Sequence, residues 1–483
     1  MGGQLPADKT PWPIRRDRAL ADGTMRHTIG VVTRRFTQAK RDAYAQYPPG
    51  EEARRHALAA KREVIRRLPE LLTEARQALE RNGAVTYVAT TADEAVERVT
   101  AILRQHQVKT VIKSKSMLTE ELELNDRLLE AGVKVRETDL GEFIIQLAGE
   151  KPSHILAPAA HKNRAQIRRL FDEDARREGI SPPVSEDTAD LTAYARQRLR
   201  QEFLQADAGI TGGNFLVAET GTVVLITNEG NADMVTTLPR VLISVIGVEK
   251  LLPRWEDFQA AVTQPALSGV GRRLSSYTTL IQGPRRPGQT EGPEAWYVVL
   301  VDNGRLSLRG TPYQDALACI RCGACLNACP VFRQLGGHAY GSVYPGPIGV
   351  VETPALSQWA TGSELPSVAC TLCHACGEIC PMGIDLPRMI VSLRTDKVKR
   401  GGVPRTQAAS YRLWAQWWAS PAGYRRSVRF ARLGQKFYRR QGRLVGAPGF
   451  AGGWFQTRTM PTVADETFHE WWQRTRERGT RHG

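Results

Sequence analysis

Residues 319–330 read CIRCGACLNACP and residues 370–381 read CTLCHACGEICP, and these two windows contain all eight cysteines of the 483-residue chain. Each window spaces its cysteines by two, two and three residues, and a proline directly follows the fourth cysteine. Two-residue gaps let a short loop wrap three thiolates around three corners of a cubane, and the fourth thiolate comes after a turn. The repeated spacing therefore predicts that the two windows hold two 4Fe-4S clusters.

The spacing also predicts which cysteines share a cluster. It resembles the run of bacterial ferredoxins, in which the fourth cysteine of each run binds the other cluster. The predicted sets are Cys319, Cys322, Cys325 and Cys380 for one cluster, and Cys370, Cys373, Cys376 and Cys329 for the other. Gly323 and Gly377 suit turns that aim backbone N–H groups at the sulfurs, since glycine tolerates unusual φ angles.

Two other uses of cysteine fit less well. Zinc sites use C-x2-C pairs but rarely add a third cysteine at the same spacing. Disulfides belong to oxidising compartments, and residues 1–23 lack the apolar segment of a secretory signal. No apolar run approaches the ~20 residues of a membrane helix. The sequence therefore predicts a cytoplasmic protein, with peripheral contact to the inner face of the membrane as an option.

A long region before the cysteines alternates between strands and helices. Strands are expected at 85–89, 110–113, 133–137 and 154–157, and helices at 92–105, 120–131 and 191–205. Segments 208–218, 221–227, 241–248 and 296–301 also have β character. Such alternation predicts an α/β fold with a parallel sheet. Residues 51–81 have helical periodicity, with a kink expected at Pro69 and a stop at Asn82-Gly83.

Four segments of this region resemble signatures of the LUD (lactate utilisation) domain: KSKSMLTEE at 113–121, HILAPAAHKN at 154–163, GITGGN at 209–214 and AETGT at 218–222. With the cysteine windows and a Trp-rich tail behind them, the chain resembles the lactate utilisation protein B family, the iron–sulfur subunits of bacterial L-lactate oxidation systems. The resemblance implies an α/β LUD domain similar to the sugar-phosphate isomerase and CoA transferase-like group. The linker of about 40 residues between the windows resembles that of α-helical ferredoxin modules.

This resemblance implies a domain order and a function. Residues 1–49 are expected to be a helical lead-in, 50–302 the LUD domain, 303–400 the α-helical ferredoxin and 401–483 a basic helical tail. The expected function is to pass electrons from the oxidation of L-lactate to pyruvate, through two 4Fe-4S clusters, toward a membrane-linked acceptor. The expected partners are a CCG-domain protein and a second LUD-domain protein.

The chain has no signature of a hydride acceptor. Neither G-x-G-x-x-G after a strand nor a P-loop occurs in it. The sequence therefore predicts an electron-transfer subunit without its own catalytic residues for lactate oxidation. Two alternatives stay open: an iron–sulfur subunit for another 2-hydroxy acid such as glycolate, and a ligand-binding regulatory protein whose clusters sense oxidation.

The LUD resemblance also implies a ligand cleft at the carboxyl ends of the strands. The candidate ligand residues are Lys113, Lys115, Asn214, Glu219 and Arg240, which supply cations, an amide and a carboxylate. Gly212 and Gly213 are candidates for presenting backbone N–H groups to an anion. The alternative is that the lysines are solvated, the glycines only form a turn, and His161 is a structural histidine.

The net charge of +16 is concentrated at the C-terminus. Residues 386–483 hold 20 of the 66 Lys/Arg residues but only 5 of the 50 Asp/Glu residues, and six of the ten tryptophans. Trp414, Trp417 and Trp418 have the spacing of one helix face. An acidic partner subunit is the first expected target of this segment, and a membrane surface is the second. Nucleic acid is not expected, since no recognition motif occurs; packing onto the ferredoxin module is the remaining alternative.

Overall fold

The computed structural model describes residues 3–447, 452, 454–455 and 458–479. The chain divides into two compact units, Met1–Asp396 and Lys397–Gly483. Among the described helices, none has the length and apolarity needed to cross a membrane.

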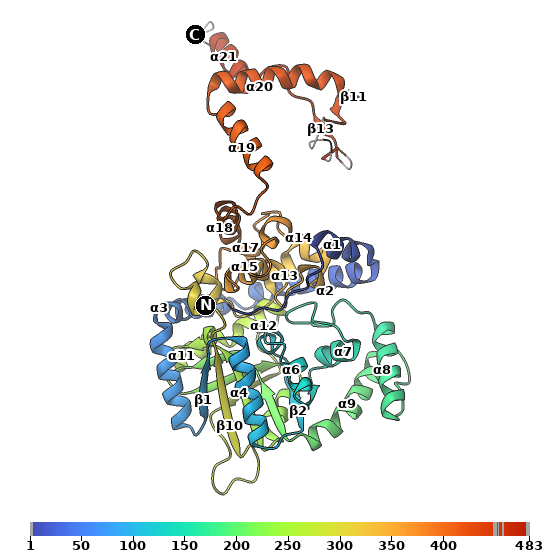
Figure 1. Cartoon of the computed structure of the whole chain (residues 1–483), viewed down its shortest axis with the longest axis vertical. Coiled ribbons are helices and arrows are strands. Elements are labelled where there is room, and N and C mark those ends of the chain that lie inside the picture. The colour runs from blue at the N-terminus through green and yellow to red at the C-terminus, as the bar shows by residue number, and fades with distance from the viewer. Residues whose placement is uncertain (1–2, 448–451, 453, 456–457, 480–483) are drawn as a thin grey trace. The chain divides into compact units, whose positions relative to one another are not determined.

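A six-stranded parallel sheet forms the centre of the first unit (Figure 1). Its strands run in the order β1-β10-β7-β4-β2-β3, and every neighbouring pair is parallel. The strands are β1 (Val85–Ala89), β2 (Thr110–Lys113), β3 (Lys134–Glu137), β4 (Ala208–Thr211), β7 (Val241–Gly247) and β10 (Ala295–Val301). The alternation in the sequence thus predicted this parallel sheet correctly.

Alternate residues of the central strands enter different hydrophobic cores. Ile243 and Val245 of β7 face one core, while Leu242 and Ile246 face the other. Helices α4 (Ala92–Gln105), α5 (Met117–Glu121) and α6 (Leu124–Glu130) contribute to the first core. The long α3 (Pro49–Arg81) and part of a second sheet contribute to the other. This sheet has the order β8-β5-β6-β9, with bounds β5 (Phe215–Val217), β6 (Thr222–Thr227), β8 (Leu251–Leu252) and β9 (Tyr277–Ile281).

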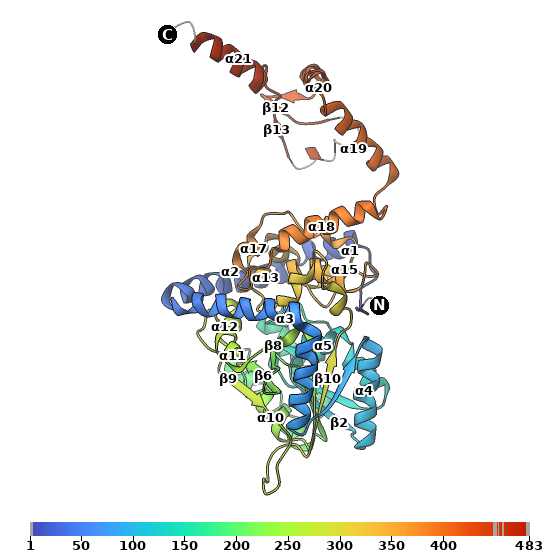
Figure 2. The ribbon, with the colours of Figure 1, turned by 90° about the vertical axis from the view of Figure 1, so that its left-hand side faces the viewer.

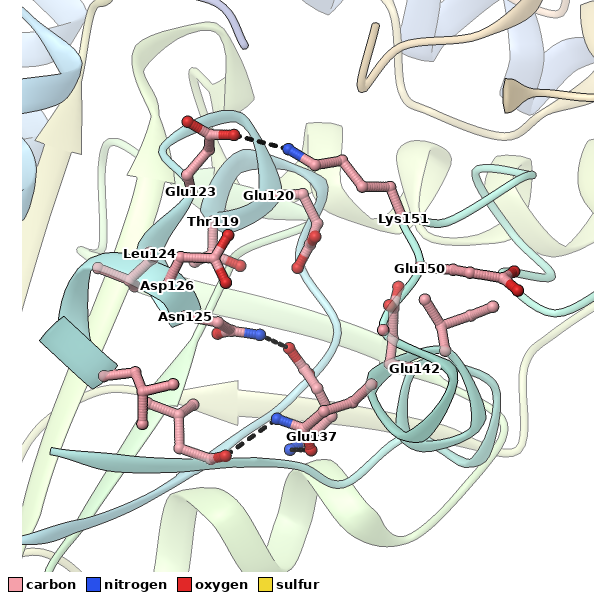
Figure 3. A pocket seen from close by; sticks show the side chains of 15 residues that line it. Thr119, Glu120, Glu123, Leu124, Asn125, Asp126, Glu137, Glu142, Glu150 and Lys151 are labelled. Atoms are coloured by element: carbon pink, nitrogen blue, oxygen red, sulfur yellow. Dashed lines mark hydrogen bonds and ion pairs between the residues drawn. The ribbon is translucent and has the colours of Figure 1, made fainter. Parts of the chain in front are cut away.

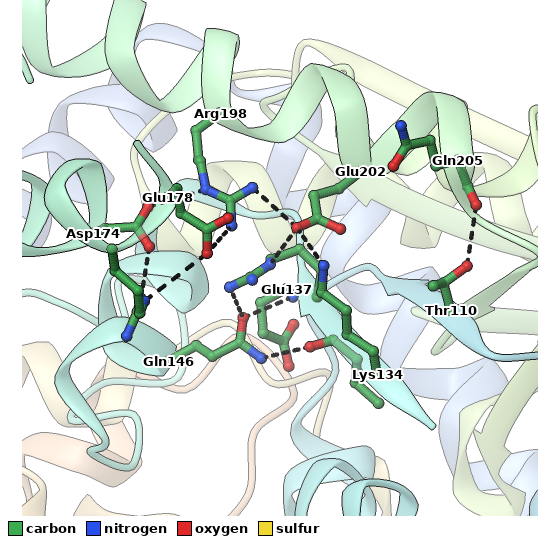
Figure 4. A network of polar contacts seen from close by, with 12 residues as sticks. Thr110, Lys134, Glu137, Gln146, Asp174, Glu178, Arg198, Glu202 and Gln205 are labelled. Atoms are coloured by element: carbon green, nitrogen blue, oxygen red, sulfur yellow. Dashed lines mark hydrogen bonds and ion pairs between the residues drawn. The ribbon is translucent and has the colours of Figure 1, made fainter. Parts of the chain in front are cut away.

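An ionic network supports the β3 edge of the central sheet (Figure 4). Arg198 of α9 (Thr188–Gln205) lies 3.1 Å from Asp174 of α8 (Arg164–Glu178) and 3.0 Å from Glu202. Glu202 also accepts from Arg136 of β3 at 3.3 Å. Helices α7 (Leu140–Ala148), α10 (Asn231–Thr237), α11 (Trp255–Ala261) and α12 (Thr263–Gly269) complete this part of the chain.

The cysteine windows lie in a mostly helical module beside the sheet domain (Figures 1 and 2). The N-terminal helices α1 (Trp12–Ala21) and α2 (Gly23–Gln46) pack on this module, against η4 (His338–Tyr340), α13 (Ala324–Ala328) and α14 (Pro330–Leu335). The other helices are α15 (Gly346–Leu356), α16 (Leu365–Val368), α17 (Ala375–Ile379) and α18 (Leu386–Lys399). Short 3-10 turns are η1 (Val248–Lys250), η2 (Leu306–Leu308) and η3 (Gln314–Ala318).

Two local predictions need correction, and a third is confirmed. The strand expected at 154–157 is absent among the described residues, because the ring of His154 accepts the backbone N–H groups of Leu156 and Ala157 and holds a turn. The helix expected at 120–131 is broken at Glu123, whose φ is +49°. The kink expected near Pro69 is confirmed, since Arg67 within α3 has non-helical angles.

The second unit contains the basic and tryptophan-rich segment. Its helices are α19 (Arg405–Trp418), α20 (Pro421–Gly434) and α21 (Phe468–Gly479), with η5 (Gln435–Phe437) and a small sheet of β11 (Arg439–Arg440), β12 (Arg443–Leu444) and β13 (Met460–Pro461). Trp414 and Trp418 share a face of α19, with ring centroids 5.1 Å apart. Both side chains are about half exposed, at 53% and 47%.

Candidate functional site

The cysteines line two separate small cavities, four to each. Cys319, Cys322 and Cys325 of the first window share a cavity with Cys380 of the second window. The other cavity is lined by Cys329, Cys370, Cys373 and Cys376. All eight thiols are free, so none is used in a disulfide. The fourth cysteine of each window therefore lies with the first three of the other.

The two cavities differ in their contact with solvent. Apolar side chains surround the first one, including Ile155, Ile348 and Leu386. Cys373 in the second cavity is exposed, whereas every cysteine of the first cavity is buried or partly buried. Burial and the neighbouring thiols, Cys376 of the other cavity among them, raise the pKa of Cys325 well above its usual range. Cys325 and Cys376 also lie on helices that pack against each other, α13 and α17, so the two sets of sulfurs are neighbours.

The backbone repeats in the two windows, although the residues differ. Arg321 and Leu372 both have positive φ, of 59° and 56°, and each directs its N–H group at the sulfur two residues before it. Two positions later, Gly323 and His374 are also left-handed, with φ of 71° and 65°. Such N–H groups are the hydrogen bonds that tune an iron–sulfur cluster.

Gly323 thus has the left-handed turn conformation expected of it, whereas Gly377 does not. Gly377 lies within α17, and its role in the turn is taken by His374. A left-handed backbone costs histidine more free energy than glycine, so the residue type at 374 does not indicate this turn. Only the spacing of this position relative to the cysteines indicates it.

A buried ionic network joins the cysteine module to the sheet domain. The guanidinium of Arg305 lies 2.8 Å from Glu121 and 2.6 Å from Glu249. Tyr344 donates to Glu121, and its ring lies 4.3 Å from the guanidinium carbon of Arg321. Arg321 in turn pairs with Glu352. The other charged groups are buried and the Arg321 side chain is only 11% exposed, so each charge depends on its partners for stabilisation.

A cavity of about 440 Å³ opens at the carboxyl ends of β2, β4 and β7. Of the candidate ligand residues, Lys115, Gly212, Gly213 and Asn214 line it. The ammonium of Lys115 donates to the carbonyl of Leu156 at 2.7 Å. Burial, together with Asp139, raises the pKa of Glu229 in this cavity to about 7. The cavity lies at the strand ends, where the resemblance implied a cleft and where open parallel sheets generally bind their ligands.

The other three candidates do not reach this cavity. Lys113 is fully buried and pairs with Glu137 at 2.7 Å and Glu120 at 3.5 Å. Glu219 accepts the backbone N–H of Trp255, which starts α11. Arg240 precedes β7, so it lies at the amino end of the sheet, where it donates to the carbonyl of His106.

The partners of Lys113 belong to a separate acidic cavity (Figure 3). Its lining includes Glu120, Glu137 and Glu142, and Asn125 donates to Glu137 at 2.6 Å. Burial and the nearby carboxylates raise the pKa of Glu142 well above its usual range. Lys113 therefore compensates buried carboxylates and is not available to an anionic ligand.

The histidines of the 154–163 segment hold the loop in place. His161 bonds to Glu150 at 2.7 Å, and its ring packs against that of His338. His154 is fully buried, and its other ring nitrogen lies 3.0 Å from the side-chain oxygen of Asn327. In the sequence, Asn327 stands between Cys325 and Cys329. The segment thus connects the sheet domain to the cysteine module.

Protonation of His154 gives a prediction for stability. Burial lowers its pKa from 6.5 to about 4. Between these values the unfolded chain binds a proton that the folded chain does not, so stability falls as the pH decreases from 6.5 toward 4. We expect a loss of about 2 kcal/mol from this group between pH 7 and pH 5, measured by urea unfolding under anaerobic conditions. In His154→Gln this part of the pH dependence should disappear; an unchanged profile would contradict the assignment.

Comparisons with known proteins agree with this arrangement. Family models match residues 72–301 (LUD domain), 315–384 (4Fe-4S dicluster domain) and 395–477 (lactate utilisation protein B, C-terminal). Lactate utilization protein B of Oceanobacillus iheyensis is 39% identical over 461 residues, which cover 95% of each chain. The chain belongs to the lactate utilization protein B family. Another relative, an uncharacterized electron transport protein (YkgF) of Escherichia coli, is 36% identical over 99% of this chain and 100% of its own.

Two residues that line the sheet cavity were not among the candidates predicted from the sequence. Lys250 follows β7, and Arg321 belongs to the first cysteine window, yet both line the cavity. A cation directly after a strand of a parallel sheet was a usable signal for Lys250. Arg321 carried no such signal, since only the packing of the two modules brings it there.

Proposed function

We propose that this chain is the iron–sulfur electron-transfer subunit of a lactate-oxidising system, with two 4Fe-4S clusters on crossed ligand sets. The observation that supports this most is the division of the eight cysteines into two cavities of four, in a 4Fe-4S dicluster domain. The names of the relatives, lactate utilization protein B and an electron transport protein, supply the metabolic setting.

The residues around each cavity fit such a group. Four thiols are available in each cavity, as a fully ligated cluster needs, and a backbone N–H group points at one sulfur in each. Bound 4Fe-4S clusters exchange single electrons with their neighbours. The apolar side chains at the first cavity exclude water, and the exposed Cys373 brings the second cavity to the surface. We infer that the second cluster exchanges electrons with an outside partner through the surface at Cys373.

The finer assignments belong to the same proposal. The domain limits are 1–49, 50–302, 303–400 and 401–483, and the sheet domain is related to the sugar-phosphate isomerase and CoA transferase-like group. The partners are a CCG-domain protein and a second LUD-domain protein, with a membrane-linked acceptor beyond them. The basic segment with Trp414, Trp417 and Trp418 docks on an acidic surface of one partner.

The test combines genetics and reconstitution. A strain that lacks the gene should lose growth on L-lactate but keep growth on glycolate, and the cloned gene should restore it. In purified form, the chain should become reduced by L-lactate only when its companion subunits are present. Growth defects confined to glycolate, or reduction of the chain alone by lactate, would contradict the proposal.

A further inference from the structure

The cavity at the strand ends and the cavity of the first cluster share a wall. Arg321 and Ile155 line both of them. Arg321 lies between Cys319 and Cys322 in the chain, and its backbone N–H lies 3.4 Å from the sulfur of Cys319. A ligand in the sheet cavity is therefore separated from the cysteines of the first cluster by single side chains.

This cavity also contains a lysine whose charge is not compensated by a direct partner. Lys250 lines it, and within the described part of the chain its ammonium makes no hydrogen bond or ion pair. The carboxylate of the adjacent Glu249 is held by Arg305 at 2.6 Å. The neighbouring Lys61 is buried and donates to the carbonyls of Glu249 and Leu251. Lys250 thus remains for an anionic ligand, beside Lys115, whose ammonium donates, among the described residues, only to the carbonyl of Leu156.

Other polar groups in the cavity suit an organic ligand larger than a simple ion. The side chain of Asn231 is buried, its nitrogen donates to Thr138, and its oxygen has no partner among the described residues. A Cβ atom on residue 212 would come within 2.7 Å of Ser116 Oγ. The backbone at Gly212 therefore lies close to the loop that follows β2. A volume of about 440 Å³ lies in the usual range for organic ligands.

We propose that this cavity binds an organic anion, with its carboxylate or phosphate group against Lys250, and that the bound anion is electrostatically coupled to the first cluster. The inference rests on the proposed function only in requiring a cluster at Cys319, Cys322, Cys325 and Cys380. An anion at this wall disfavours the addition of an electron to the cluster. Because coupling is reciprocal, the reduced protein must bind the anion more weakly than the oxidised protein does.

Equilibrium dialysis of the anaerobic, cluster-loaded full chain tests this, with pyruvate and adenosine monophosphate, neither of which dithionite reduces, as separate probes. The first carries a carboxylate, and the second a phosphate on a ligand that fills more of the cavity. We expect at least one probe to bind, about tenfold more weakly after reduction with dithionite, which corresponds to a potential lowered by 59 mV for one electron. Binding of pyruvate identifies a small carboxylate ligand, and binding of adenosine monophosphate identifies a phosphate-bearing one.

Variants separate this site from nonspecific attraction to a basic protein. Lys250→Gln should lower the affinity for the bound probe at least tenfold, and Lys250→Arg should retain most of that affinity. Lys109→Gln removes a lysine just before β2, at the other end of the sheet, and should change nothing. Binding that Lys250→Gln leaves intact, equal affinity of oxidised and reduced protein, or no binding of either probe would each overturn the inference. If the protein holds two clusters but binds neither probe, this inference fails while the proposed function stands; a protein without clusters contradicts the proposed function instead.

Discussion

Replacing Cys322 and Cys380 together by serine should cost only one cluster, although these residues come from different windows. With crossed ligation both belong to the same site, so the double variant should retain about four irons of about eight. Replacing Cys373 and Cys380 together should instead damage both sites and remove nearly all iron, although both cysteines lie in the second window. The measurement is the iron and acid-labile sulfide content of anaerobically purified protein.

The single variants serve as controls for this experiment. Cys322→Ser, Cys373→Ser and Cys380→Ser should each lose about four irons. If each window held its own cluster, the results of the two double variants would be exchanged. That outcome would contradict the crossed sets, which correspond to the two groups of four cysteines that line the two cavities in the structure.

Removing the cation at the centre of the buried ionic network should have the largest effect on stability. Arg305→Met leaves Glu121 and Glu249 buried without their common partner, and their side chains are 0% and 4% exposed. Breaking a buried ion pair by removing one partner typically costs about 3–5 kcal/mol, because an uncompensated charge remains. We expect a loss of this size in the free energy of unfolding in urea.

A matched surface variant distinguishes burial from simple loss of an arginine. Arg285→Met breaks a pair with Glu294 whose side chains are 33% and 57% exposed, and should cost about 1 kcal/mol or less. Adding Glu121→Gln to Arg305→Met should restore part of the stability, since one buried charge is removed. Equal effects of Arg305→Met and Arg285→Met would contradict the role of Arg305.

Local patterns in the sequence predicted much of the fold and the grouping of the cysteines into two sets of four. The strands at 85–89 and 110–113 and the helix at 92–105 have the predicted bounds, because apolar periodicity and short connections define them locally. The cysteine spacing determines the ligand loops, since both windows adopt the same backbone despite different residues at Gly323 and His374. The turn around His154 was missed because a side chain there satisfies the backbone groups that a strand would pair.

The ligand site could be predicted only in part, because charge compensation depends on distant residues. Lys113 has the same local context as Lys115, but Glu137 of the neighbouring strand binds Lys113 and removes it from the cavity. Arg240 and Lys250 flank the same strand, and only the direction of β7 decides which one lies at the cavity end. The closeness of Arg321 to this cavity results from packing between modules, which no local pattern encodes.

The most direct test of the central claim is the metal content and redox behaviour of the chain purified without oxygen. The account predicts about eight irons and eight sulfides per chain, and reversible one-electron reduction at two sites without loss of iron. Zinc in place of iron, or a protein that stays colourless after reconstitution with iron and sulfide, would contradict it.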